Sequence, residues 1–138
     1  MKNYYRTVML LVFTLFTCGP AATYSLAQQI DPKALYEIVS SNNLVLDNQG
    51  SMETSANIFI AKPIANRISQ VWSITPAGDG YYLISSPTGG MSIDNDNAPA
   101  GDPAKVIQWA TDAGNPNQQW KITPTGDGKY TFTCKTSG

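Results

Sequence analysis

The sequence contains no histidine, and glutamate occurs only twice, as Glu37 and Glu53. Enzymes draw most of their general acids, bases and nucleophiles from histidine, carboxylates and activated cysteine. No serine lies in the glycine-flanked context of a nucleophile elbow. Asp94 and Asp96 could in principle form a glycosidase pair on a turn, but nothing in the sequence gives either of them a raised pKa. We therefore expect no catalytic residues and no enzymatic activity in this chain.

Charged residues are also scarce, at 14% of 138 residues, and the 9 Lys and Arg nearly balance the 10 Asp and Glu. They form no basic cluster of the kind that binds nucleic acid or anionic lipid. We therefore expect neither nucleic acid nor, once a signal peptide has been removed, a membrane as a partner.

Residues 1–27 are typical of a secretory signal peptide. Lys2 and Arg6 precede an apolar run over 8–16, and residues 25–27 (Ser-Leu-Ala) offer small side chains where a signal peptidase reads them. The apolar run is too short to cross a bilayer core of ~30 Å. We expect a secreted or periplasmic protein. Lipoprotein processing at Cys18 is the alternative, because the residues before it loosely resemble a lipobox.

Cysteine is rare, and Cys134 would be the only one left after such cleavage, so no internal disulfide can form. The remaining chain has the length of one domain. Residues 28–34 are expected to form a linker, with Asp31-Pro32 as a breaker. The domain itself would begin at residue 35.

From residue 35 onward no window shows the periodicity of an amphipathic helix, but a long internal repeat is present. Gln70-Val71-Trp72 and Gln118-Gln119-Trp120 are 48 residues apart, and each is followed, after one residue, by Ile-Thr-Pro-x-Gly-Asp-Gly. Self-similarity at a fixed period of this size indicates a repeat architecture. Repeat one covers 35–80, repeat two covers 81–128, and 129–138 begin a third copy.

Short runs rich in Ile, Val, Tyr and Trp alternate in each repeat with Asn, Gly, Asp, Pro and Ser, which predicts an all-β fold. We expect four strands per repeat and an Asp-Gly turn with positive φ after each repeat. The expected strands lie near 36–39, 44–46, 58–61 and 70–74, and near 82–85, 91–93, 106–109 and 118–122.

These motifs resemble the ricin B-type β-trefoil lectins, which carry one Gln-x-Trp per repeat. The resemblance covers 35–138 and is most specific in repeat two, through Ser92-Ile93-Asp94, Val106-Ile107-Gln108-Trp109 and Asn117-Gln118-Gln119-Trp120. It implies a β-trefoil, in which three hairpins close a barrel and three cap it, with one shallow sugar pocket per repeat. It also implies a secreted carbohydrate-binding module without a cofactor, whose partner is a glycan or polysaccharide. The chain could then be the binding module of a longer glycan-degrading enzyme.

The family pattern assigns roles to four residues of repeat two. Trp109 would be the platform on which the apolar face of a sugar stacks, and Asp94 would accept hydrogen bonds from two neighbouring hydroxyls. Asn117 would hydrogen-bond another hydroxyl, and Gln118 would support Asp94 or contact the sugar.

The chain departs from that pattern next to the platform. The family often has Gln two residues before the aromatic residue, where this chain has Ile107. Gln108 lies beside it and is expected to point to the other face of the strand.

Repeat one lacks most of the residues to which the family pattern assigns a sugar-binding role. Ala61 stands at the position of Trp109, and Ser69 stands at the position of Asn117. Asp47 is left without a platform, so we expect that pocket to be inactive.

Each role also has a structural alternative. A Trp that recurs once per repeat is typical of a core residue, so we expect Trp72 and Trp120 in the core, with Gln70 and Gln118 satisfying buried backbone groups around them. The residues with a proposed sugar role could also be structural. Trp109 could be a core residue, and Asp94 and Asn117 could be turn residues. The alternative function is therefore a protein-binding or structural β-trefoil without sugar affinity.

We expect no metal site. Residues 94–97 (Asp-Asn-Asp-Asn) resemble the start of a calcium loop, but the Gly and the terminal Glu of an EF-hand are missing at the required spacing.

The third copy is expected to be incomplete, with only the strand at 130–135 present. A trefoil closes its barrel with strands from three repeats, and closure removes exposed sheet edges. We expect the sequence to be a fragment of a longer chain, or partner chains to complete the barrel. The apolar faces formed by Ile38, Ile84 and Phe132 would then lack part of their packing.

Overall fold

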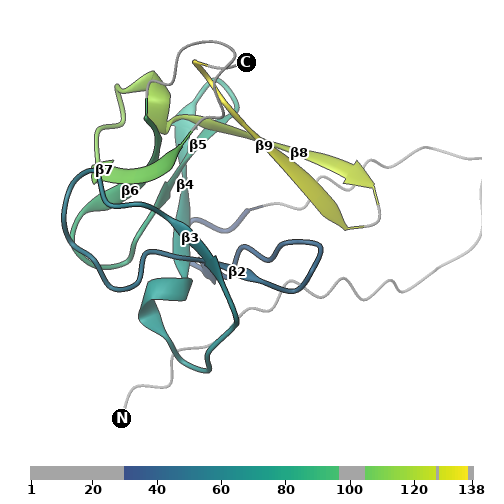
Figure 1. Ribbon diagram of the computed structural model, residues 1–138. Coiled ribbons are helices and arrows are strands. Elements are labelled where there is room, and N and C mark those ends of the chain that lie inside the picture. The colour runs from purple at the N-terminus through teal and green to yellow at the C-terminus, as the bar shows by residue number, and fades with distance from the viewer. Residues whose placement is uncertain (1–29, 97–104, 127, 137–138) are drawn as a thin grey trace, which may run out of the picture.

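The computed structural model describes residues 30–96, 105–126 and 128–136. The expected signal peptide, the Cys18 alternative and the last residue of the calcium-like run lie outside these ranges. The described part consists of nine β-strands and two short 3₁₀ helices (Figure 1). In this part of the chain, no helix is long and apolar enough to span a membrane.

The strands are β1 (Leu35–Tyr36), β2 (Val45–Asp47), β3 (Phe59–Ala61), β4 (Trp72–Gly78), β5 (Tyr81–Ser85), β6 (Met91–Asn95), β7 (Val106–Ala110), β8 (Trp120–Gly126) and β9 (Lys129–Cys134). The 3₁₀ helices are η1 (Ile68–Gln70) and η2 (Pro116–Gln118). The prediction of an all-β fold is therefore confirmed.

The expected strand boundaries were wrong at the two Gln-x-Trp triplets. Gln70 and Gln118 end the 3₁₀ helices, and the strands begin only at Trp72 and Trp120. The reason is that each Gln side chain bonds the backbone of its own preceding loop. Gln70 accepts from Ile64 N through Oε1 at 2.7 Å, for example, which holds the residue in a turn rather than in a ladder.

Five strands follow one another as antiparallel neighbours, in the order β1, β4, β5, β8 and β9. The β6–β7 hairpin joins the same sheet through β5, where Ser85 pairs with Ser92, whereas β2 and β3 form a separate two-stranded sheet. Both long hairpins of the barrel carry the same bulge, at Pro76/Gly78 and at Pro124/Gly126. The first of them turns through Asp79 and Gly80 with φ values of 51° and 77°, the positive φ expected of this dipeptide.

The core lies between these strands and the hairpins. Its buried side chains are Tyr36, Trp72, Ile74, Ile84, Ile93, Trp120 and Cys134. Each Trp indole also donates to a hairpin strand: Trp72 Nε1 bonds Leu46 O at 3.3 Å and Trp120 Nε1 bonds Ile93 O at 3.0 Å. The two triplets therefore join the barrel to its hairpins at equivalent places.

Among the described residues, β1 pairs only with β4, and β9 pairs only with β8. Of the three side chains expected to lack part of their packing, Phe132 on β9 is exposed, whereas Ile38 is half-buried and packs against the core. Ile84 contradicts that expectation, because it lies in the core at 2% exposure, covered by the strands around β5. Completion of the barrel by further chain stays a prediction.

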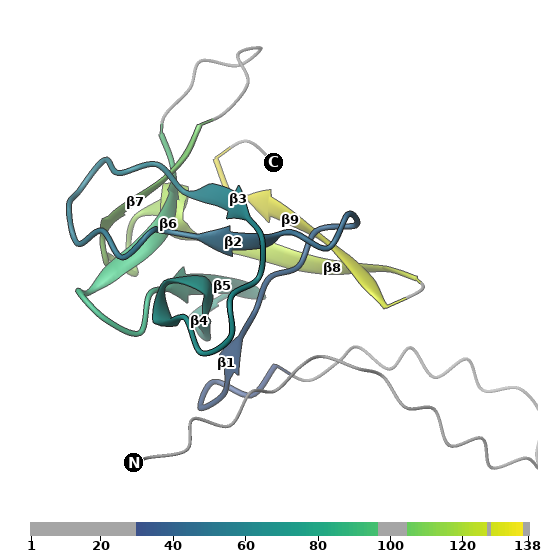
Figure 2. The same cartoon turned by 60° about the horizontal axis from the view of Figure 1, so that its bottom comes forward.

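The two repeats also meet along β7. On one side β7 pairs with β6, and on the other it bonds residues 55–58 of repeat one, through Ser55 N to Gln108 O at 2.9 Å and Ile58 N to Val106 O at 3.0 Å. Figure 2 shows the loop between β2 and β3 passing beside β7. Repeat one therefore contributes a third extended segment beside the two strands of the β6–β7 hairpin.

Candidate functional site

The β6–β7 hairpin of repeat two places Asp94 and Trp109 on one face. Ser92 pairs with Trp109, and Asp94 pairs with Ile107. Directly paired residues of antiparallel strands project to the same side, so Asp94 and Trp109 are diagonal neighbours there. Trp109 is 42% exposed, unlike Trp72 and Trp120, so it lies outside the core.

Asp94 lies within strand β6 and not on a turn, which corrects the expectation from the sequence. Its carboxylate is nearly buried and accepts two amide hydrogen bonds at Oδ2, from Gln118 Nε2 at 3.0 Å and from Asn115 Nδ2 at 3.3 Å. Over the described ranges, Oδ1 accepts no hydrogen bond. One carboxylate oxygen of this site is therefore held in place and the other is left as an acceptor.

Gln118 is fully buried and connects Asp94 to the loop after β7. Its Nε2 also donates to Ala110 O at 3.0 Å, and its Oε1 accepts from Asp112 N at 2.9 Å. Because its polar atoms bond protein groups, Gln118 orients the carboxylate of Asp94.

Asn117 lies in η2, which packs against β6, and is buried at 7% exposure. The turn before it is fixed by Asn115, whose Oδ1 accepts from Asn117 N at 3.0 Å. The sequence analysis missed Asn115, which both shapes this turn and holds Asp94. Asn115 lies 48 residues after Arg67, so a comparison of equivalent positions in the two repeats could have identified it.

The pKa of Asp94 is raised above its ordinary value of 3.8. Burial is the main cause and the nearby charge of Asp96 adds to it, while the hydrogen bond from Gln118 acts in the opposite direction. This shift could not be predicted from the sequence, because the burial of Asp94 depends on how η2 packs against β6.

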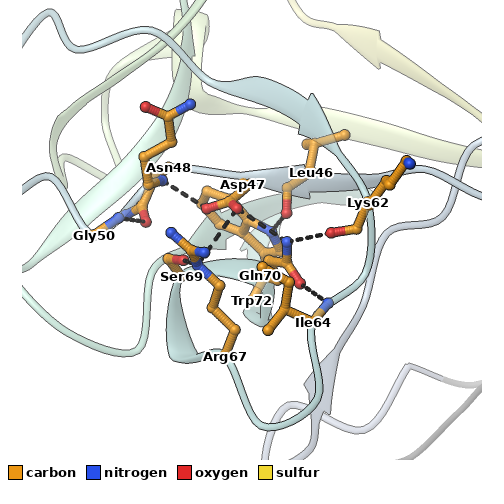
Figure 3. Close-up of polar contacts among 11 residues, drawn as sticks. Leu46, Asp47, Asn48, Gly50, Lys62, Ile64, Arg67, Ser69, Gln70 and Trp72 are labelled. Carbon is orange, nitrogen blue, oxygen red and sulfur yellow. Dashed lines mark hydrogen bonds and ion pairs between the residues drawn. The ribbon is translucent and has the colours of Figure 1, made fainter.

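In repeat one, the equivalent carboxylate of Asp47 is fully engaged (Figure 3). Oδ1 accepts from Gln49 N at 2.6 Å and Oδ2 from Gln70 Nε2 at 3.0 Å. Arg67 Nε lies 3.7 Å from Oδ2 and donates to Ser69 Oγ at 3.0 Å. Arg67 thus occupies the place that Asn115 has in repeat two.

Burial alone would raise the pKa of Asp47, but the pKa is lowered. Hydrogen bonds from Ser69, Gln49 and Gln70, together with the charge of Arg67, outweigh the burial. The pKa values of the two carboxylates are therefore shifted in opposite directions.

One aromatic residue near Asp47 was missed by the sequence analysis. Phe59 pairs directly with Asp47 across β2 and β3 and is 42% exposed. It stands at the position of Ile107, not of Trp109. Repeat one thus has an exposed aromatic side chain, but both oxygens of the carboxylate beside it already accept hydrogen bonds from protein groups.

Gln108 points to the face opposite Trp109, as expected, and is fully buried. Its Nε2 donates to Ser51 O at 3.0 Å and to Glu53 O at 2.9 Å, and its Oε1 accepts from Asn48 Nδ2 at 3.0 Å. These contacts, which the sequence did not reveal, fasten the loop of repeat one to β7.

Within the described ranges, no group of three or more His, Cys, Asp or Glu is placed to hold a metal ion. What this site offers is an exposed indole ring, one available carboxylate oxygen and buried amides that hold them. Such a set can stack on an apolar ring face and accept hydrogen bonds from hydroxyls.

Comparisons with known proteins agree with this architecture. A family model described as "Ricin-type beta-trefoil lectin domain-like" matches residues 22–109 and 70–138. None of the curated proteins matches the chain.

Among solved structures, the designed 3-fold symmetric protein ThreeFoil is 32% identical with a TM-score of 0.69, covering 75% of this chain and 74% of that one. An exo-beta-1,3-galactanase from Clostridium thermocellum is 30% identical with a TM-score of 0.70; the match covers 80% of this chain but only 24% of the galactanase.

A lectin from Polyporus squamosus, solved with the epitope Neu5Aca2-6Galb1-4GlcNAc, is 24% identical with a TM-score of 0.64, over 75% of this chain and 37% of the lectin; that likeness shows the fold alone. The predicted β-trefoil and the predicted family are both confirmed. The chain belongs to the family of ricin-type β-trefoil lectin-like domains.

Proposed function

We propose that this protein is a carbohydrate-binding module that holds a sugar on the outer face of the β6–β7 hairpin. The observation that carries the proposal is that an exposed indole, Trp109, lies on the same face as a fixed carboxylate, Asp94, whose Oδ1 has no partner among the described residues. A pyranose needs both, because it has an apolar face of C–H groups and a rim of hydroxyls.

Each residue of the site would have its own role in binding the sugar. Trp109 stacks on the apolar face of the sugar, and Asp94 accepts from its hydroxyls. Asn117, at the turn beside Asp94, hydrogen-bonds a further hydroxyl. Gln118 and Asn115 keep the carboxylate in place, so little ordering is needed when the sugar binds.

The family and the neighbouring structures support carbohydrate binding in general. The lectin-like family model and a galactanase are both among the matches. Because the chain spans about a quarter of the galactanase, we also propose a non-catalytic module, with chemistry left to other domains of a longer protein. Secretion or export to the periplasm is part of the proposal and rests on residues 1–27 alone.

A second candidate function is binding of another protein without sugar affinity. Its support is four exposed apolar side chains on β3, in the loop after it and in η1, namely Phe59, Ile60, Ile64 and Ile68, of which Phe59 and Ile60 project to opposite faces of the strand. Exposed apolar patches commonly mark interaction surfaces.

A glycan array, followed by affinity electrophoresis through gels that contain a β-1,3-galactan, separates the two functions. We expect retention by at least one neutral glycan and competition by the matching free sugar. A folded protein, judged by its thermal melt, that binds no glycan on the array would overturn the carbohydrate proposal and leave the protein-binding one.

A further inference from the structure

Asn57 is an exposed residue of repeat one that lies against the hairpin of repeat two. It forms an antiparallel bridge with Ile107. The bridge is flanked by the hydrogen bonds Ile58 N to Val106 O at 3.0 Å and Gln108 N to Ala56 O at 2.8 Å. Asn57 and Ile107 are therefore a non-hydrogen-bonded antiparallel pair, the type in which the side chains approach most closely.

Asn57 therefore shares a face with the proposed sugar residues. Ile107 pairs with Asn57 on one side and with Asp94 on the other, so the three side chains form one row across three strands. Successive side chains of an extended segment point to opposite faces. This agrees with the placement of Asn57, because the next residue, Ile58, packs against the core.

The row is wider than one sugar ring. Two strand spacings separate Asn57 from Asp94, which is roughly 9–10 Å. Ile107 lies between them at 3% exposure, and Trp109 is the next residue on that face of β7. A sugar stacked on Trp109 and bonded to Asp94 would thus leave Asn57 beyond its edge, next to any unit linked to it.

The segment that carries Asn57 is firmly held. Besides its backbone bonds to β7, the loop before it is fastened by the buried side chain of Gln108, which bonds Ser51 O and Glu53 O. A side chain on a fixed segment loses little freedom when it binds a ligand.

We propose that the site continues from repeat two onto Asn57 of repeat one, so that it takes an oligosaccharide of at least two units. The first unit lies on Trp109 and Asp94, and the carboxamide of Asn57 both donates to and accepts from hydroxyls of the second. A neutral carboxamide suits a neutral, hydroxyl-rich unit. This inference rests on the proposed carbohydrate function and adds the length of the ligand.

Isothermal titration of the whole protein tests it with galactose, glucose and N-acetylglucosamine, each against its β-linked disaccharide: galactobiose, cellobiose and chitobiose. We expect the disaccharide of the preferred sugar to bind on the order of fivefold more tightly than its monosaccharide, the effect of one added hydrogen bond. In Asn57→Val, which keeps a strand-forming residue, the disaccharide should bind only as tightly as the monosaccharide, whose affinity stays unchanged.

Two further variants make the result specific. Asn57→Gln keeps a carboxamide and should restore part of the preference for the disaccharide. Thr133→Val makes the same kind of change at an exposed position of β9, away from the row, and should alter neither affinity.

Equal affinity of the wild-type protein for a monosaccharide and its disaccharide would overturn the inference and leave the carbohydrate proposal intact. So would an Asn57→Val protein that keeps the disaccharide preference, or one that loses both affinities together with its thermal stability. Failure of the wild-type protein to bind any of the six sugars would instead count against the proposed function, and the inference would fall with it.

Discussion

The two repeats build the same scaffold around an aspartate and differ in what reaches its carboxylate. Gln70 Nε2 bonds Asp47 Oδ2 and Gln118 Nε2 bonds Asp94 Oδ2, both at 3.0 Å. Each Gln also bonds the backbone of its preceding loop through both ends of its amide. The supporting residue of the two sites is therefore equivalent in position and in contacts.

The difference lies in the side chains around the carboxylate, among them the two that follow and the change from Ser69 to Asn117. Where repeat two has Asn115 and Trp109, repeat one has Arg67 and Ala61. Burial acts to raise both pKa values, but at Asp47 it is outweighed by hydrogen bonds, from Ser69 first, with the charge of Arg67 as the smallest contribution. At Asp94, where Asn115 adds only an amide, burial prevails. The two repeats thus share a scaffold, while the side chains around each aspartate differ.

The largest effect is expected where the repeats are alike. Trp72 is 1% exposed, and Trp72→Ala removes a core side chain together with its bond to Leu46 O. We expect a loss of ~3–5 kcal/mol in the free energy of unfolding. Urea denaturation measures it. An unchanged midpoint would show that the triplets do not hold the core.

Gln118→Ala and Gln70→Ala should each cost less, about 1–3 kcal/mol, because each leaves buried hydrogen-bonding groups without their partner. The two variants form a matched pair, and similar losses in thermal melts would confirm that the scaffold is equivalent. They should differ in sugar binding, which only Gln118→Ala weakens through Asp94. Equal effects on sugar binding would contradict the assignment of the site to repeat two.

The two carboxylates should also respond differently to pH. Asp47 has a folded pKa below 3.8, so it contributes stability at neutral pH that is lost as the pH falls through that lowered pKa. Asp94 has a folded pKa above 3.8, so its ionised form disfavours the folded state, and this penalty fades as the pH falls through the raised pKa.

Thermal melts of Asp47→Asn and Asp94→Asn between about pH 7 and pH 3 test these signs. Asp47→Asn should be less stable than the wild-type protein at neutral pH, whereas Asp94→Asn should be as stable or more so. Both differences should shrink in acid. The opposite order at neutral pH would show that the pKa directions are wrong.

The smallest expected effect is that of Asp47→Ala on sugar binding, which should be none. Both oxygens of Asp47 already accept hydrogen bonds from protein groups, and the residue is only 2% exposed, which leaves little access for a ligand. Titration with the glycan found on the array measures this. A clear loss of affinity in a folded variant would show that repeat one binds as well, with Phe59 as a possible aromatic contact.

Much of the fold could be predicted because it depends on local patterns that recur every 48 residues. The strand runs, the Asp-Gly turn at Asp79 and the core positions of Trp72 and Trp120 all follow from residue type and spacing. The placement of Gln70 and Gln118 in 3₁₀ helices did not follow, since it depends on bonds to loops several residues away.

The site was only partly predictable for the same reason. The sequence pointed to Asp94 and Trp109, and the structure puts them on one face of a hairpin. It did not reveal Asn115 beside Asp94, or Arg67 beside Asp47, because those contacts depend on how η2 and η1 pack. The approach of Asn57 from repeat one is a contact between repeats, and no pattern within a single repeat contains it.

The central claim is that Trp109 is a sugar platform and not a core residue, and Trp109→Ala tests it most directly. The variant and the wild-type protein should be compared in one affinity gel and one thermal melt. The account predicts that sugar retention is lost while the melting temperature stays close to that of the wild-type protein, because the ring is 42% exposed. Unchanged sugar retention with an unchanged melt would contradict the claim, as would unfolding at the ~3–5 kcal/mol cost of a core residue.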